Sequence, residues 1–377
     1  MLTLRHVIPM LGLGLVAACN DDPGLGAQCV IEHHEALPES VPDYHHAIAA
    51  DSEGRVHVSG PPKHLVRAPD GTWTVEEEAF GVGYFSKALL TASGSSVFVA
   101  HAGNGIRVAR DDGGAWTTLF ERSYEQCSGH PYVERVKATD DGGVILASSE
   151  GLLRIREGAD PEKLPYAGSW AADGAGLLTC EAGDDLTIVD GSGEATLPLA
   201  FNRVLALSAS PRGGAAILLD REDEGGVWLV RRGADGRWDA NPTQLAAWTE
   251  AECPEDPMPG EMCSARSTRV DAADVIPAGE SLIAFIVLRH GRADHRIWSC
   301  EPVVGSWEHC YWTWKGEWTY EHELWMGDLS AKEPVLHRVT LPEAWDLGEA
   351  NPVAAPGADG SVHALFGDSY ARILCPN

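Results

Sequence analysis

The stretch DDGGVILASSEGLLRIR (residues 140–156) contains a short unit that decides the fold. A turn of small and acidic residues ends in Gly, and an apolar strand follows it. A loop then leads to a second strand, which contains Arg154. Gly adopts turn conformations that other residues avoid, and short apolar runs bounded by such turns are typical of strands. The unit therefore predicts two short strands separated by a tight loop.

Looser copies of this unit recur along the chain, and their number indicates the architecture. They begin at residues 50, 92, 172, 210, 277 and 357. Radial repetition of short strands is typical of a β-propeller, whereas the strand-like alternation and the dense Gly disfavour a helical solenoid. Seven copies predict an all-β chain with one seven-bladed β-propeller. Six or eight blades, a pair of β-sandwiches or another β-rich array are the alternatives.

A second recurring element places Asp, Gly and Trp close together. It is longest in RDDGGAWTTL (residues 110–119) and shorter in PDGTW (69–73) and ADGRW (234–238). The longest copy resembles the Asp-box of BNR-type propellers, S-x-D-x-G-x-x-W. Asp111, Gly113 and Trp116 match that pattern, while Ala109 replaces its Ser. The resemblance implies propeller turns in which the Trp begins the next strand. Since Asp-box propellers include sialidases, it also implies an alternative function, a glycan-active hydrolase or lyase that uses the central channel.

The two ends of the chain are expected to meet and to close the ring. The last repeat stops after its second strand, and the segment AQCVIEHHEAL (residues 27–37) is a strand without a partner. Adding this segment to the final blade would complete the blade and bring Cys29 close to Cys375. We therefore expect a disulfide between these two cysteines.

The N-terminus predicts export. Residues 1–18 are interpreted as a signal peptide because one Arg precedes a short apolar stretch that ends in small residues. The small residues before Cys19 resemble a bacterial lipobox, which implies lipidation of Cys19 and anchoring to the cell envelope, at the outer membrane, the cell surface or the periplasmic side. An ordinary secretory peptide is the alternative. Residues 19–28 then form a tether, and residues 29–377 form the propeller domain.

The eight remaining cysteines suggest four disulfides in an exported chain. Besides Cys29–Cys375, the short spacings favour Cys253–Cys263 and Cys300–Cys310. Each pair would close an insertion in the propeller, near residues 248–268 and 295–325. Cys127–Cys180 follows by elimination.

Composition narrows the class of partner. A formal charge of −28 disfavours nucleic acid and anionic membrane surfaces, so the expected membrane contact is the lipid anchor alone. The second insertion is rich in aromatic side chains that suit a protein or carbohydrate ligand, unless they pack the extended blade. These residues are Trp298, Trp307, Tyr311, Trp312, Trp314 and Trp318. We expect a monomeric binding or scaffold module.

Chemistry-bearing residues give only weak signals. His33 and His45 lie in a segment rich in His and acidic residues, where a transition metal is a minor alternative to surface polarity. His57 and His363 occupy the same place in the first and last repeats and would be neighbours if that strand lined the channel. Acidic turns could bind calcium, although Asx-turns explain them more simply. No nucleophile or phosphate-binding motif is recognised. The sequence therefore favours a binding module over an enzyme and names no catalytic residue or cofactor.

Overall fold

The computed structural model of the protein describes residues 28–38, 47–60, 63–76, 87–113, 116–127, 130–139, 141–165, 168–173, 176–190, 193–198, 200–210, 214–221, 225–233, 235–248, 262–303, 307–342 and 352–375. Side chains 87, 172, 173, 176, 262–267, 292–297, 301–303, 307–309 and 312–319 are not described. Within these ranges the secondary structure is β, apart from one short 3-10 helix, η2 (Tyr124–Gln126). No helix in the described part is long and apolar enough to cross a membrane.

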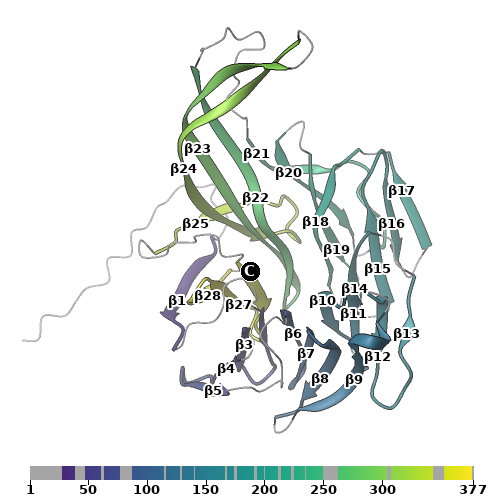
Figure 1. The fold of residues 1–377 in the computed structure, drawn as a ribbon. Helices are drawn as coiled ribbons and strands as arrows, with labels where there is room; N and C mark the ends of the chain where they lie inside the picture. The colour runs from purple at the N-terminus through teal and green to yellow at the C-terminus, as the bar shows by residue number, and fades with distance from the viewer. Residues whose placement is uncertain are drawn as a thin grey trace, which may run out of the picture.

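Seven four-stranded antiparallel sheets form a ring, which confirms the predicted seven-bladed β-propeller (Figure 1). Blade 1 consists of β2 (Ala47–Ala50), β3 (Val56–Gly60), β4 (Lys63–Arg67) and β5 (Trp73–Glu76). Blade 2 consists of β6 (Lys87–Ser93), β7 (Ser96–Ala102), β8 (Gly105–Asp111) and β9 (Thr117–Ser123). Blade 3 consists of β10 (Val133–Ala138), β11 (Val144–Ser148), β12 (Gly151–Ile155) and β13 (Glu162–Lys163).

The chain continues around the ring in the same order. Blade 4 consists of β14 (Ser169–Asp173), β15 (Gly176–Glu181), β16 (Leu186–Asp190) and β17 (Gly193–Leu197). Blade 5 consists of β18 (Arg203–Ala209), β19 (Ala215–Asp220), β20 (Gly226–Arg232) and β21 (Thr243–Ala247). Blade 6 consists of β22 (Met262–Ala278), β23 (Ser281–Val303), β24 (Trp307–Asp328) and β25 (His337–Val339).

Blade 7 contains both ends of the described chain. It consists of β26 (Val353–Pro356), β27 (Val362–Phe366), β28 (Ser369–Leu374) and, as its outermost strand, β1 (Val30–Ala36). Val30 pairs with Leu374 and Ala36 with Ser369. The adjacent Cys29 and Cys375 form a disulfide, with their Cα atoms 4.0 Å apart. The predicted closure of the ring by an N-terminal strand is therefore confirmed.

Each copy of the sequence repeat begins at the turn between the first and second strands of a blade. In blade 1 the Asp51 N–H donates to the Arg55 carbonyl (3.0 Å) and the Gly54 N–H donates to the Asp51 carbonyl (3.1 Å). Gly54 has φ +79°, as a type I turn followed by a bulge requires. The same pair of bonds recurs in the equivalent turns of blades 3 and 7, residues 139–143 and 357–361. It also recurs in the turns between the third and fourth strands of blades 1 and 5, residues 68–72 and 233–237. The strands read from the sequence are thus the second and third strands of each blade.

Asp-Gly recurs in these turns because the carboxylate accepts a backbone N–H two residues further on. Asp70 accepts from Thr72 (2.9 Å) and Asp359 accepts from Ser361 (3.0 Å). In PDGTW, Trp73 begins β5, as expected. Its indole N–H donates to Glu35 on β1 (3.1 Å), so this Trp connects blade 1 to blade 7.

Apolar side chains fill the interfaces between neighbouring blades. The largest cluster lies between blades 6 and 7 and contains Phe285, Met326, Phe366 and Ile373. The cluster between blades 1 and 2 is small and consists mainly of Ala and Val side chains, among them Ala47, Ala88, Val97 and Val99. Interfaces between blades therefore differ in how much apolar surface they bury.

Two further predicted disulfide pairings involve described residues. Cys300 and Cys310 are bonded across the β23–β24 hairpin, as predicted. The predicted Cys127–Cys180 pairing is wrong, because both residues are free thiols. Cys180 lies within β15 in the cluster between blades 4 and 5, whereas Cys127 follows η2 beside the cluster between blades 2 and 3. Elimination failed because the cores of different blades separate these two residues. Cys253 lies outside the described residues, so Cys253–Cys263 stays a prediction.

Candidate functional site

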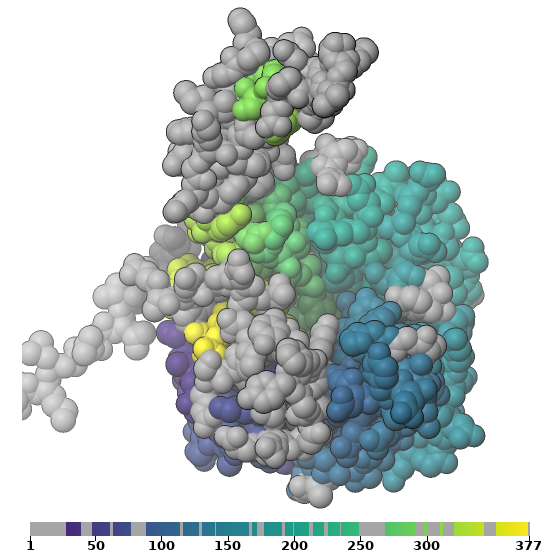
Figure 2. Space-filling view, in the orientation of Figure 1, coloured from purple at the N-terminus to yellow at the C-terminus, as the bar shows by residue number. Residues whose placement is uncertain are grey.

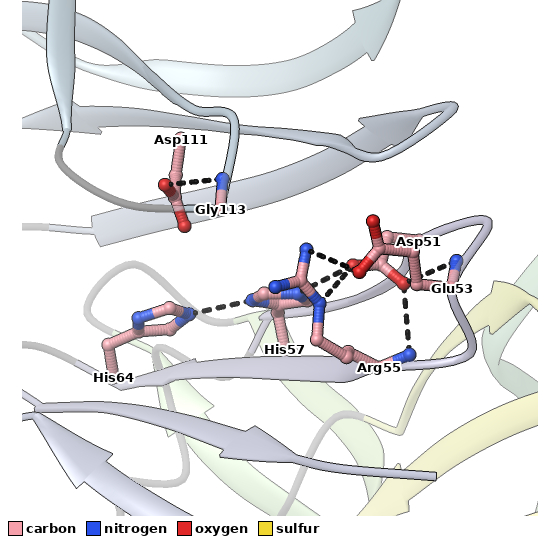
Figure 3. Close-up of polar contacts among 7 residues, drawn as sticks. All are labelled: Asp51, Glu53, Arg55, His57, His64, Asp111 and Gly113. Atoms are coloured by element: carbon pink, nitrogen blue, oxygen red, sulfur yellow. Dashed lines mark hydrogen bonds and ion pairs between the residues drawn. The ribbon is translucent and has the colours of Figure 1, made fainter.

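A chain of polar side chains runs through the interface between blades 1 and 2 (Figure 3). The Asp51 carboxylate accepts hydrogen bonds from the Arg55 side chain (2.6 Å) and from two backbone N–H groups of its own turn. It also contacts His57 Nε2 at 3.5 Å. His57 Nδ1 lies 3.2 Å from His64 Nε2, and His64 Nδ1 lies 3.0 Å from the Glu76 carboxylate. The network therefore spans all the outer strands of blade 1.

These hydrogen bonds constrain the protons that the network holds. A ring nitrogen must accept in the His57–His64 bond, while each carboxylate accepts from the ring beside it. All three contacts are satisfied when the two rings together carry three N–H protons. Burial, together with the charge of the neighbouring His64, lowers the pKa of His57 to about 4, so His57 is neutral at pH 7.

The two histidine rings of the network serve packing between blades 1 and 2, because both are buried. His57 and His64 are each 1% exposed, and the ring of Trp116 on blade 2 lies edge-on against His64 at 5.4 Å. Arg55 lies beside the turn of blade 2 that contains Asp111 and Gly113 (Figure 3). Thus the longest Asp-Gly-Trp element contacts a neighbouring blade from both its turn and its Trp.

His57 and His363 hold equivalent positions but do not line the channel, so the expectation that they meet there is wrong. They lie on β3 and β27, the second strands of their blades, whereas the first strands surround the axis. His57 faces blade 2, and His363 faces blade 1. The Nδ1 atom of His363 lies 2.7 Å from the hydroxyl of Tyr370, which is on β28 of the same blade. Burial lowers the pKa of His363 to about 4. Both histidines are interior packing residues.

His33 and His363 line a groove of about 600 Å³ at the seam between blades 7 and 1. The charged groups of this groove are already paired. Arg67 donates to Glu35 (2.5 Å), and Arg372 donates to Asp359 (2.5 Å). Burial alone would raise the pKa of Glu35, but the hydrogen bond and charge of Arg67 lower it overall. The groove therefore offers no free charge to a ligand.

The metal hypothesis gains no support from the described part of the chain. It contains no group of three or more His, Cys, Asp or Glu side chains that could hold a metal ion. His57 also faces a different blade interface from His33 and His363. His45 lies outside the described residues.

Blade 6 carries a long arm that projects away from the ring (Figures 1 and 2). We define the arm as residues 262–269, 289–303 and 307–323 of β22, β23 and β24. β24 is 22 residues long, whereas β7 and β8 of blade 2 have 7 residues each. The outermost strand β25 pairs only with Leu324, Trp325 and Met326, so no described strand covers the outer edge of β24 along the arm.

The arm and the closing disulfide lie on opposite faces of the propeller. The turn at Gly279 joins β22 to β23 on the same face as the residue 357–361 turn of blade 7, and the arm consists of the far ends of those strands. Ile373 pairs with Val362, next to that turn, so Cys375 lies on the turn face. Cys29, which is bonded to Cys375, therefore lies on the face opposite the arm.

Ion pairs fix the root of the arm to the blade. Asp271 contacts Arg289 and His322, each at 3.3 Å, and the Arg289 guanidinium lies 4.7 Å from the centre of the Tyr320 ring. Asp271, Arg289 and His322 are each less than one fifth exposed, so water screens the attraction between Asp271 and Arg289 weakly. These contacts hold the base of the arm in a defined direction.

The aromatic residues predicted as a ligand surface belong to this arm. Trp298 pairs with Trp312 across β23 and β24, and Ser299 pairs with Tyr311, next to the Cys300–Cys310 disulfide. Trp298 and Tyr311 are half-buried. The side chains of Trp307, Trp312, Trp314 and Trp318 lie outside the described part, although their backbones are in β24.

The innermost strands of all seven blades surround a central channel with two connected chambers. The chamber towards the arm face has a volume of about 260 Å³ and is lined by Arg135, Lys137 and Phe285, among others. The chamber towards the turn face has a volume of about 190 Å³ and is lined mainly by small side chains such as Ala92 and Ala209. Lys137 and Asp274 line both chambers.

Sequence reasoning missed the polar residues of the channel. Arg135 and Lys137 are two positions apart on β10, and such spacing places both side chains on one face of a strand. That alternation is visible in the sequence, but the repeat begins just before the second strand of each blade, so it assigns no position to the innermost strand. The arginines of four repeats, Arg67, Arg107, Arg154 and Arg372, lie on the third strands of their blades, away from the channel.

Known structures support the fold and no more. No protein-family model matches the chain, and no curated protein matches it in sequence. A streptogramin B lyase structure matches with a TM-score of 0.53 and 13% identity, over 91% of this chain and 98% of that one. The Neurospora crassa Pan2 WD40 domain (TM-score 0.49, 12% identity, 93% and 96% covered) and YCF48 bound to a D1 peptide (0.49, 10%, 91% and 97%) also match. At 13% identity, the match to the lyase structure supports the β-propeller fold alone.

Proposed function

We propose that this chain is a lipid-anchored β-propeller of the bacterial cell envelope that binds a protein or glycan ligand through its blade 6 arm. The observation that carries the proposal is the position of the arm, on the face opposite Cys29, the residue that follows the expected tether. A chain anchored at Cys19 would direct the arm away from the membrane. Loops and extensions on a rigid scaffold are where binding functions concentrate.

The arm has the features that a contact surface needs. Its aromatic residues supply large contact areas at a small cost in side-chain entropy. The Asp271 ion pairs and the Cys300–Cys310 disulfide limit the movement of its strands, which reduces the entropy lost on binding. The edge of β24 that no described strand covers adds backbone donors and acceptors that a ligand can engage.

A glycan array and a hydrolysis screen on the exported chain test this proposal against a glycan-active hydrolase or lyase. Saturable binding without turnover is expected, and Trp312→Ala with Trp314→Ala should weaken it tenfold or more. Tyr124→Ala, which removes an exposed aromatic side chain on blade 2, is the matched control and should leave binding unchanged. Binding that survives the double substitution, or turnover abolished by a single carboxylate substitution, would contradict the proposal.

Anchoring is tested separately. Globomycin-sensitive processing and acyl labelling of the wild-type chain should both disappear in Cys19→Ala. Labelling that persists in this variant would exclude Cys19 as the lipidated residue.

A further inference from the structure

The channel contains two cations that stand apart from the other basic residues. The chain has 56 acidic and 28 basic side chains, so a carboxylate partner is easy to find. Arg122 on blade 2 pairs with Glu150, and Arg154 on blade 3 pairs with Asp141. Among the residues that the structure describes, neither Arg135 nor Lys137 forms an ion pair with a carboxylate. Arg135 donates one hydrogen bond to the Trp170 carbonyl (2.9 Å), which orients its guanidinium.

Both cations line the chamber towards the arm face, and both are half-buried. Two like charges on one face of a strand repel each other, and partial burial strengthens that repulsion because water screens it less. An anion bound between the two cations would be attracted to both and would accept a charge-assisted hydrogen bond from each of them. The β10 pair thus provides a preformed anion-binding wall.

The remaining walls define the rest of the ligand. Ile48, Leu90, Val136 and Val353 supply apolar surface. Two carboxylates line the same chamber: the exposed Glu134, next to Arg135 on β10, and Asp274, from β22 on the other side of the ring, which accepts a hydrogen bond from the Val275 N–H (2.8 Å). A second negative charge on the ligand would be repelled by these carboxylates, whereas a hydrogen-bond donor would be attracted. A volume of about 260 Å³ equals roughly nine waters at about 30 Å³ each.

We propose that the chamber between Arg135, Lys137 and Asp274 binds a small monocarboxylate with an apolar body, entering from the arm face. Arg135 and Lys137 bind the carboxylate, the apolar walls surround the body, and Asp274 accepts a hydrogen bond from a donor at the other end. A zwitterionic ligand of this kind fits better than a simple monoanion. The site does not involve the arm aromatics, so it is independent of the proposed function.

Calorimetry on the full chain in detergent micelles tests the proposal, with benzoate and 4-(aminomethyl)benzoate as probes. Both should bind the wild type at millimolar concentrations or below, and the zwitterion should bind more tightly. Lys137→Met should weaken both at least tenfold. Lys163→Met, an exposed position on the outer strand of the same blade, is the matched control and should bind as the wild type does. Asp274→Asn should strengthen benzoate binding and remove the preference for the zwitterion.

A second measurement needs no variant. Benzoate should protect Lys137 of the wild-type chain from acetylation, mapped by mass spectrometry, and leave Lys163 reactive. The proposal is overturned if the wild type binds neither probe, if Lys137→Met binds them unchanged, or if benzoate gives no selective protection. Trp312→Ala with Trp314→Ala should leave probe binding intact, so failure of this site and failure of the arm proposal are distinguishable.

Discussion

The interface between blades 6 and 7 is filled by apolar side chains, whereas the interface between blades 1 and 2 contains His57, His64 and His101 beside a small apolar cluster. The first is dominated by aromatic contact, with Phe285 and Phe366 ring centres 6.0 Å apart, and ends at the closing disulfide. The second is held by hydrogen bonds whose strength depends on protonation. One propeller thus combines an interface that is indifferent to pH with one that is sensitive to it.

Acid should produce the largest effect and should act on the polar interface. Burial lowers the pKa of His57 and of His101 from 6.5 to about 4. The unfolded chain therefore binds protons from about pH 6.5 downward, while the folded chain resists until about pH 4. Stability is complete above pH 6.5 and falls through this window by roughly 3 kcal/mol for each histidine. Urea unfolding followed by Trp fluorescence at pH 7 and pH 4.5 measures the loss.

An unfolding free energy that stays constant between these two pH values would contradict the contrast between the interfaces. His363 at the seam between blades 7 and 1 should add a similar loss.

Phe285→Ala tests the apolar interface. This side chain is 1% exposed, and removing a buried Phe costs roughly 3–5 kcal/mol through lost transfer energy and a cavity. The loss should be the same at pH 7 and pH 5.5, because the side chains that pack against this ring in its cluster are apolar. Tyr132→Ala, at an exposed position, should change stability by about 0.5 kcal/mol or less. A loss of unfolding free energy that differs between the two pH values in Phe285→Ala would contradict the distinction between the two interfaces.

Replacing both Cys29 and Cys375 by Ser should lower the unfolding free energy by roughly 2–4 kcal/mol, because the open chain gains conformational entropy when it unfolds. The same change at Cys300 and Cys310 is the matched control. It should cost less, since that disulfide lies in the arm, beyond the packed core. Differential scanning calorimetry compares the two variants, and an equal loss in both would show that the seam has no special role.

His101→Leu should give the smallest effect and the opposite sign. His101 is 8% exposed, and neither ring nitrogen has a hydrogen-bond partner in the described structure. Removing a buried unsatisfied polar group should stabilise the chain by roughly 1–3 kcal/mol at pH 7 and reduce its acid sensitivity. His64→Leu, which removes a hydrogen-bonded ring, should destabilise it. Chemical denaturation measures the stability of both variants. If His101→Leu is less stable than the wild type and His64→Leu is more stable, the conclusion that His64 is hydrogen-bonded and His101 is not would be wrong.

The sequence predicted the blades and their closure because both depend on local patterns. Gly54 and Gly360 mark turns, and the unpaired segment around Cys29 matched the incomplete last blade. The placement of Cys180 was not predictable, since it depends on which blade core a strand side chain enters. The contact between His57 and His64 was not predictable either, because it depends on the register between β3 and β4. The Lys137 chamber needs strands from opposite sides of the ring, and no local pattern reports such a distance.

The Cys29–Cys375 bond has a consequence for how the molecule tolerates cutting. Residues 29–375 form a covalent circle, so one proteolytic nick between blades releases nothing until the disulfide is reduced. Such a nick leaves a permuted chain with a new pair of ends at the cut. Fusing the natural ends with a peptide linker and opening the chain between any two blades should therefore give an equivalent molecule.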